Sequence, residues 1–362
     1  MVICFDATFE AHNALQRLTA SGRYPDSSAA ISAAICNLAV LDAAVQRGGG
    51  TFVPALANAA VAGPSPAEAM HPSGLRTSDI PQIFSLPKAD VNADDFVVSA
   101  GSSSSAAIAG PKDWPWGQFN KLLPLKTTVR ALFNVLAHDR ETPLMDAANR
   151  ITAASAQLAV FLRRIDKANG YAREDAMASA FPSDTQSKEK SLIRFSEQFV
   201  FGAGSFATSS FPFEFGFVAP AIGRENVIRL TGAGASFAVL PNPILDGDAQ
   251  TAASKFNPEE LNFLRQHVLA TVPTERAALT AILSGLHAGH NSPDALDNFL
   301  RGEFPQQAES LTPAVLTTQR AGAISRAIDL LLVRRRREGV RVFYEVEPAG
   351  HDFFHAANST KI

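Results

Sequence analysis

Residues 324–353 read ISRAIDLLLVRRRREGVRVFYEVEPAGHDF, and this stretch decides the fold. An apolar, helix-compatible segment leads into a strand at Leu332–Arg336, a Glu338-Gly339 turn and a second strand at Val340–Val346. Two such strands around a glycine-containing turn are typical of a β-hairpin. The stretch therefore predicts a helix at about residues 317–331 that runs directly into an arginine-rich hairpin.

A related pattern occurs 116 residues earlier. Residues 229–238 (RLTGAGASFA) align with residues 345–354 (EVEPAGHDFF), and each segment directly follows a predicted hairpin. In both, a phenylalanine stands three residues after a glycine, and internal similarity of this kind indicates a repeated structural unit. We interpret each copy as a strand that leaves its sheet through a tight glycine turn, after which Phe237 or Phe353 folds back onto the core.

Helical patterns precede both hairpins, which predicts a mainly α protein with small β hairpins (α+β) and two copies of one unit, at residues 121–247 and 255–356. The central copy has predicted helices from Pro124, at Pro143–Lys167 and at Ser187–Phe201, and predicted strands at Phe217–Ile222 and Val227–Leu230. The C-terminal copy has predicted helices at Pro258–Thr271, Thr274–Leu286, Ser292–Leu300 and Thr317–Leu331.

Helices that end in a two-stranded wing resemble the winged helix-turn-helix regulators of the MarR and PadR kind, in which LT-x-x-G is a common ending of the wing. Residues 230–234 (LTGAG) and the stretch at 324–353 carry the resemblance. It implies a tandem winged-helix DNA-binding protein. In that family the helix before the wing enters the major groove, and the hairpin contacts the flanking backbone or the minor groove.

The N-terminal stretch LQRLTASGRYPDSSAAISAAICNL, at residues 15–38, resembles the ribbon-helix-helix DNA-binding proteins. The resemblance covers residues 1–47 and implies that two chains pair their strands. The strand at Val2–Phe5 lacks the basic or amide side chains that suit base edges. We therefore expect this unit to dimerise the chain rather than to contact DNA. Residues 48–120 have the composition of a linker.

Composition and charge limit the classes of protein. The chain of 362 residues is 46% apolar and 19% charged, which is typical of a globular protein. It has no apolar run of about 20 residues and no basic N-terminal region, so we expect a cytoplasmic, nucleoid-associated protein with no membrane partner. Residues 1–120 carry 6 Lys/Arg and 10 Asp/Glu, whereas residues 121–200 carry 12 and 9, and residues 311–345 carry 7 and 3. Two basic patches thus coincide with the two copies.

The resemblance assigns the DNA-contacting residues of the C-terminal copy. Glutamine can pair with adenine, arginine with guanine, and hydroxyl groups with phosphate. Because side chains alternate along a strand, at most half of the arginine tract can face one DNA groove. The candidates on the helix are Thr317, Thr318, Gln319, Arg320, Ser325 and Arg326, and those on the wing are Arg334, Arg335, Arg336, Arg337 and Arg341.

The central copy offers a weaker set of candidates, since Glu189 and Glu197 lie on the same helix. An alternative for the arginine tract is a solvated hairpin whose charges pair with Glu338 and Glu345. The candidates in the central copy are Gln186, Ser187, Lys188, Lys190, Arg194 and Arg224.

Enzymatic readings have little support in the sequence. Gly232-x-Gly234 lacks the rest of a dinucleotide-binding fingerprint. The pairs His287-x-x-His290 and His351-x-x-x-His355 are read as structural histidines, because the first has no evident further ligand and the second lies near the C-terminus. We therefore expect no enzyme, no cofactor and no metal site.

The sequence thus favours sequence-specific binding of double-stranded DNA, by a homodimeric transcriptional regulator. The alternative is a winged-helix interaction scaffold, or an accessory subunit of a replication, plasmid-maintenance or defence assembly. A sensor that holds a small-molecule effector in its phenylalanine-rich core also remains open at this point.

Overall fold

The computed structural model describes residues 80–87, 109–139, 141–182, 188–201, 210–221, 224–247, 252 and 254–359, all within one unit that spans Gly74–Ile362. The predicted ribbon-helix-helix unit at 1–47 lies outside the described residues, as does most of the predicted linker at 48–120.

Local sequence sets the helices of the C-terminal copy. Each helix that the structure describes after residue 254 begins with proline, whose fixed φ and missing amide suit the first helical position. Asn257 and Glu260 form a complete capping box at the first of these helices, which begins and ends where predicted. The helix before the hairpin begins four residues earlier than predicted. The helices are α9 (Pro258–Thr271), α10 (Pro273–His287), α11 (Pro293–Glu303), α12 (Pro305–Glu309), α13 (Pro313–Asp329) and α14 (Pro348–Ser359).

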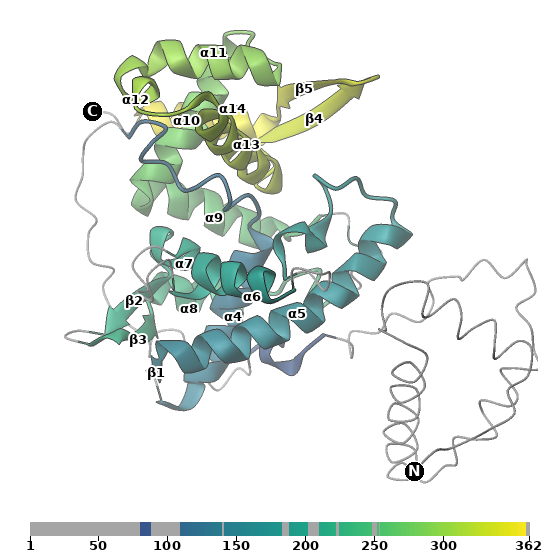
Figure 1. The fold of residues 1–362 in the computed structure, drawn as a ribbon, viewed down its shortest axis with the longest axis vertical. Helices are drawn as coiled ribbons and strands as arrows, with labels where there is room; N and C mark the ends of the chain where they lie inside the picture. The colour runs from purple at the N-terminus through teal and green to yellow at the C-terminus, as the bar shows by residue number, and fades with distance from the viewer. Residues whose placement is uncertain are drawn as a thin grey trace, which may run out of the picture. The chain divides into compact units, whose positions relative to one another are not determined.

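The central copy has a similar succession of helices, and the long second helix lies within about a residue of its predicted bounds. In Figure 1, the helices of this copy lie below α9 and those from α10 onward lie above it. The helical elements of the central copy are α4 (Leu123–Asp139), α5 (Leu144–Ala168), η4 (Met177–Ala180), α6 (Lys188–Ser196), the π-helical turn η5 (Glu197–Phe201), α7 (Phe211–Glu214) and α8 (Gly232–Val239); η2 (Gln82–Phe84) precedes them.

Two small antiparallel sheets accompany the helices, which confirms the predicted mainly α class with small β hairpins. Each copy contains the predicted hairpin. In the central copy a short additional strand pairs with the second strand of the hairpin, so the strand order is β1-β3-β2. The strands are β1 (Thr142–Pro143), β2 (Val218–Ala221) and β3 (Arg224–Leu230) in the central copy, and β4 (Val333–Glu338) and β5 (Arg341–Val346) in the C-terminal copy.

The pairing beside each hairpin is also repeated. Ile228 of β3 pairs with Thr142 of β1. At the position 116 residues later, the amide of Tyr344 in β5 donates to the carbonyl of Asn291 at 2.8 Å. The segment that follows α4 in the central copy and the segment that follows α10 in the C-terminal copy therefore lie against the same point of the hairpin.

The connection from helix to hairpin has the same geometry in both copies. Gly216 and Leu331 both have a left-handed backbone, with φ of 66° and 54°. The amide of the following residue, Phe217 or Leu332, bonds the carbonyl five residues before it at 2.9 Å. This is the Schellman arrangement that ends a helix. It turns the chain directly into the first strand in each copy.

The hairpin is closed against that same connection. The amide of Thr231 donates to the carbonyl of Phe217 at 3.0 Å, and the amide of Glu347 donates to the carbonyl of Leu332 at 2.9 Å. Thr231 also caps α8, since its hydroxyl accepts from the amide of Gly234 at 3.0 Å. In each copy the residue after the second strand thus ends the hairpin and starts a helix.

The predicted glycine turn after each hairpin is wrong, because both segments are helices. Gly234 and Gly350 lie in the first turn of α8 and α14, and neither has a positive φ. Their small size matters instead. A Cβ on Gly234 would lie 2.1 Å from the carbonyl oxygen of the residue before β2, and one on Gly350 would lie 2.2 Å from the matching oxygen before β4. The predicted return of Phe237 and Phe353 to the core is confirmed, since both are buried.

Replacing Gly234 by alanine is expected to lower the free energy of unfolding by about 1–3 kcal/mol, because the added methyl group forces the helix away from the hairpin. Gly232→Ala is the matched control, since Gly232 lies in the same first turn with no atom within 4 Å of an added Cβ. Urea denaturation followed by circular dichroism measures both. Equal midpoints for the two variants would contradict the proposed close packing.

The two copies share one hydrophobic core and are joined by buried polar contacts. Lys126 of the central copy forms an ion pair with Glu260 of the C-terminal copy at 3.0 Å, and both side chains are fully buried. The amide of Leu122 donates to a carboxylate oxygen of Asp329 at 2.9 Å. The two segments predicted as separate domains, 121–247 and 255–356, therefore pack as one body.

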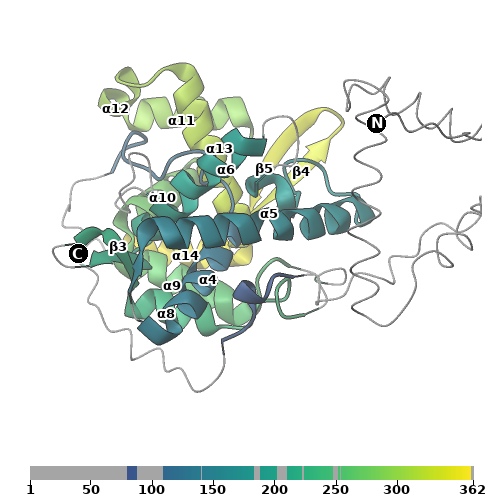
Figure 2. The same cartoon turned by 60° about the horizontal axis from the view of Figure 1, so that its bottom comes forward.

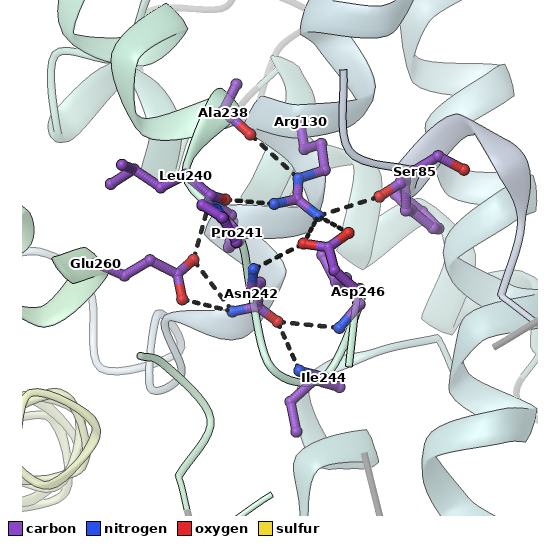
Figure 3. A network of polar contacts seen from close by, with 12 residues as sticks. Ser85, Arg130, Ala238, Leu240, Pro241, Asn242, Ile244, Asp246 and Glu260 are labelled. Atoms are coloured by element: carbon purple, nitrogen blue, oxygen red, sulfur yellow. Dashed lines mark hydrogen bonds and ion pairs between the residues drawn. The ribbon is translucent and has the colours of Figure 1, made fainter. Parts of the chain in front are cut away.

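The turn-rich segment at the end of the central copy, residues 241–247, is fixed from both sides (Figure 3). The buried guanidinium of Arg130 donates to Asp246 at 2.7 Å and to the carbonyl of Ala238 at 3.1 Å. The side-chain amide of Asn242 donates to Glu260 at 3.0 Å, and its backbone amide donates to Asp246 at 2.7 Å. The predicted boundary is thus a structural joint that both copies hold.

A segment before the first helix of the central copy crosses α13 of the C-terminal copy. We call residues 109–122 the strap. Trp114 and Phe119 anchor the strap in the core, each 1% exposed. Between them, Gly117 lies very close to Gly322 of α13. A Cβ added to Gly322 would lie 2.6 Å from the Cα atom of Gly117. The strap covers one side of the helix that the sequence analysis places in a DNA groove.

Candidate nucleic-acid interface

The β4–β5 hairpin projects from the body of the protein (Figure 1). Its strands pair in register up to Glu338 and Arg341, which leaves a two-residue turn. Gly339 has a φ of 62° and Val340 has a negative φ, as in the type II′ turn that suits twisted hairpins. Val340 at the tip is fully exposed. The turn thus presents an apolar side chain between two charged strand ends.

One face of the hairpin carries Arg334 and Arg336. Arg334 forms ion pairs with Glu345 at 2.5 Å and Glu347 at 3.3 Å. Arg336 forms ion pairs with Glu338 at 2.7 Å and with Glu345 at 3.1 Å. The alternative prediction that the arginines pair with Glu338 and Glu345 is therefore confirmed for this face.

The opposite face carries Arg335 and Arg337, as the predicted alternation requires. Arg335 forms an ion pair with Asp175 at 2.6 Å, and Arg337 forms one with Glu174. Both acidic residues belong to the loop after α5, and in Figure 2 the hairpin lies above the C-terminal half of that helix. Sequence reasoning missed these partners, because no local signal links positions about 160 residues apart.

The four arginines of β4 differ in the exposure of their side chains. The side chains of Arg334, Arg336 and Arg337 are 66%, 55% and 53% exposed, whereas that of Arg335 is 14% exposed. Ion pairs between exposed side chains contribute only about 0–1 kcal/mol. Arg341 is exposed as well. A phosphate group can therefore replace a carboxylate at the exposed positions with little loss of stability.

The structure corrects the predicted groove-reading role of most of α13. Gln319, Arg320 and Ser325 are less than 10% exposed, and Arg326 is fully buried. These four side chains cannot reach a base edge in this conformation. Thr317 and Thr318 are exposed.

Distant acidic partners explain the burial of the two arginines. Arg326 donates through two nitrogens to Glu275 at 2.7 and 2.8 Å, and through the third to the carbonyl of Phe119 in the strap at 2.7 Å. Arg320 donates to Asp297 at 2.9 Å. Both arginines hold α13 against its neighbours and serve the fold.

The candidates of the central copy are more scattered. Lys190 and Arg194 are exposed on α6, on either side of the half-exposed Ile193. Lys188 begins the same helix and Arg224 begins β3. Gln186 and Ser187 lie outside the described residues.

Two adjoining hollows lie beside the loop after α5. The outer groove, of about 670 Å³, is lined by Arg334, Arg335 and Arg337. The inner cavity, of about 220 Å³, contains the ion pair between Lys255 and Asp329, whose atoms are 2.8 Å apart. Burial works against the charge on Lys255, but the Asp329 carboxylate raises its pKa. The outer groove thus has arginines on its hairpin side and an apolar part formed by Ile328, Leu331 and Val333.

One histidine of the first predicted pair lies beside one of the second. The ring of His287 lies 4.8 Å from that of His351, and the ring of His290 lies against Phe299. Within the described ranges, no three His, Cys, Asp or Glu side chains are arranged to hold a metal ion. No helix in this part of the chain has the length and apolar character needed to cross a membrane.

Comparison of the chain with protein-family models, with curated proteins and with solved structures finds no match.

Proposed function

We propose that the chain binds double-stranded DNA through the β4–β5 hairpin and acts as a homodimeric transcriptional regulator. The observation that carries this proposal is a projecting two-stranded hairpin with four exposed arginines, Arg334, Arg336, Arg337 and Arg341. Residues 333–346 contain five arginines and two glutamates, a net charge of +3. A cationic ribbon of this kind suits the phosphate backbone or the minor groove.

The repeated architecture supports a tandem winged-helix arrangement. In each copy a segment that follows α4 or α10 pairs with the hairpin, and further helices, the hairpin and a closing helix come after it. In winged-helix proteins the hairpin is the wing. The N-terminal unit at 1–47 would supply the dimer contact by pairing strands, as its resemblance to ribbon-helix-helix proteins implies.

Contacts by the hairpin carry more of this proposal than contacts by α13. The exposed polar side chains of α13 are Thr317 and Thr318, which can bond phosphate but do not select a base strongly. Affinity would come from arginine–phosphate contacts, and sequence preference from the shape of the DNA at the wing. Binding is then expected to weaken steeply with salt.

Replacing Arg336 and Arg341 together by glutamine is expected to weaken DNA binding at least about tenfold at low salt. It should also reduce the slope of log affinity against log salt by about two, since each phosphate contact contributes nearly one unit. Fluorescence anisotropy with duplexes selected from a random pool measures both quantities.

The matched control replaces two exposed cations outside the hairpin, Lys112→Gln with Arg150→Gln. It removes the same charge and should leave the slope unchanged. Arg150 lies 18 residues before the end of α5, about 27 Å along the helix from the loop that meets the hairpin. Indifference of the unaltered chain to every duplex at low salt would sink the proposal.

One observation favours a second candidate function, an interaction scaffold. Arg334 through Arg337 all have acidic partners within the chain, as expected if the hairpin only stabilises the fold. Replacing these four arginines by glutamate separates the candidates. A regulator loses DNA binding, whereas a scaffold still co-purifies with the same partner protein as the unaltered chain.

A further inference from the structure

The groove between the hairpin and the loop after α5 has the chemistry of a site for a phosphodiester backbone. Arg335 and Arg337 point from the same face of β4. Residues two apart on a strand are about 6.7 Å apart, so the two guanidinium groups form a row. Both line the groove of about 670 Å³. A row of guanidinium groups in a groove suits an anion that repeats along a chain, since arginine binds phosphate oxygens in a bidentate manner.

Two carboxylates already occupy this row. Asp175 bonds Arg335 at 2.6 Å, and Glu174 bonds Arg337. Asp175 and Glu174 have side chains that are 48% and 34% exposed, so they meet the arginines at the edge of the groove and not in the core. We call Glu174 and Asp175 the acidic pair.

The fold holds the acidic pair in place through its backbone. Lys121 donates to the carbonyl of Glu174 at 2.5 Å, and the amide of Asp175 donates to the carbonyl of Ala172 at 2.9 Å. Just beyond, the Asp166 carboxylate accepts from the amide of Met177 at 2.8 Å. The loop is therefore fixed at both ends while its two acidic side chains reach out to β4.

Charge counting shows what the acidic pair does to the hairpin. The hairpin has five arginines against Glu338, Glu345 and the adjacent Glu347, a net charge of +2. The acidic pair brings the sum to zero. Without it, Arg335 and Arg337 lose the carboxylates with which they form ion pairs in this structure.

We propose that the row formed by Arg335 and Arg337 binds the phosphodiester backbone of a nucleic acid, and that Glu174 and Asp175 occupy this site in its absence. The inference rests on the proposed function and adds to it a second face of the hairpin and a competitor within the chain. Binding then exchanges two carboxylates for two phosphates at the same guanidinium groups.

The test removes the charge of the acidic pair with Glu174→Gln and Asp175→Asn in the full chain. We expect the variant to bind duplex DNA about tenfold or more tightly at low salt, with a salt slope larger by up to two units. It should also elute from heparin at higher salt. The matched control, Glu303→Gln with Glu309→Gln, removes two exposed carboxylates from α11 and α12 and should change neither quantity beyond a small nonspecific effect.

A further variant shows whether the gain acts through the proposed row. Adding Arg335→Gln and Arg337→Gln to the acidic-pair variant should abolish the gain in both assays. Persistence of the gain would overturn the proposal, as would equal DNA affinities and slopes for the acidic-pair variant and its control.

The outcomes also separate this inference from the proposed function. If no version of the chain binds DNA, the function fails. If the acidic-pair variant instead binds single-stranded RNA more tightly than the unaltered chain does, and this binding requires Arg335 and Arg337, a nucleic-acid backbone site is retained. If the variant gains affinity only for an acidic polypeptide such as polyglutamate, or only for heparin, the assignment to nucleic acid is overturned.

Discussion

Replacing Glu275 by leucine is expected to lower the free energy of unfolding by about 3–5 kcal/mol, because it leaves the charge of Arg326 buried without a partner. Both side chains are completely buried, and their closest atoms lie 2.7 Å apart. The third contact of Arg326, with the carbonyl of Phe119, ties the strap to α13. Loss of the carboxylate therefore weakens the contact of α13 with the strap as well as its contact with α10.

Urea denaturation, followed by the fluorescence of the buried Trp114, measures this loss. Glu338→Gln is the comparison, since Glu338 pairs with Arg336 on the surface, and its removal should change the free energy of unfolding by at most about 1 kcal/mol. Adding Arg326→Met to Glu275→Leu should recover most of the loss, because no buried charge then remains. Similar effects of Glu275→Leu and Glu338→Gln would contradict this account.

The stability of the protein is expected to rise with pH above neutrality because of Lys126. Burial, together with the nearby Arg130 charge, lowers the pKa of Lys126 to about 7, against 10.5 for an ordinary lysine. Between these values the unfolded chain binds more protons than the folded chain. The free energy of unfolding therefore rises with pH in this window, by at most about 1.4 kcal/mol per pH unit from this group.

The carboxylate of Glu260, the partner of Lys126, changes the free energy of unfolding in the opposite direction at lower pH. Burial raises the pKa of Glu260 above 4.5, so the folded chain binds more protons there, and stability falls as the pH rises through that range. In the double variant Lys126→Met, Glu260→Gln, both the fall in stability at acidic pH and the rise above neutrality should be smaller. Thermal or urea denaturation at pH 5 to 10 measures the profile. Lys112→Gln, at an exposed lysine, should keep the slope of the unaltered chain, and an unchanged slope in the double variant would refute the assignment to Lys126.

Local signals made part of this fold predictable. Asn257 and Glu260 cap α9 within four residues, so its start could be placed from the sequence. The alternation of Arg334 through Arg337 follows from strand geometry alone, and the hairpin confirms it. Capping and strand alternation depend only on a few neighbouring residues, so both can be predicted from the sequence.

Tertiary contacts account for the features that could not be predicted. Gly234 resembles a turn residue in sequence, but its small size is needed because it packs on a carbonyl 17 residues before it. Arg320 and Arg326 resemble DNA-reading residues until Asp297 and Glu275 are brought beside them. The acidic pair that faces β4 depends on contacts across both copies. Which charged side chains are buried thus depends on tertiary partners that the sequence alone does not identify.

The charges shared between the two halves have a consequence for truncation of this protein. Lys126 of the central copy has its carboxylate in the C-terminal copy, and Asp329 of the C-terminal copy accepts from the amide of Leu122. Removing either half would therefore take away the partner of a charged side chain in the other half and expose the shared apolar core. We expect the two halves to fold only together.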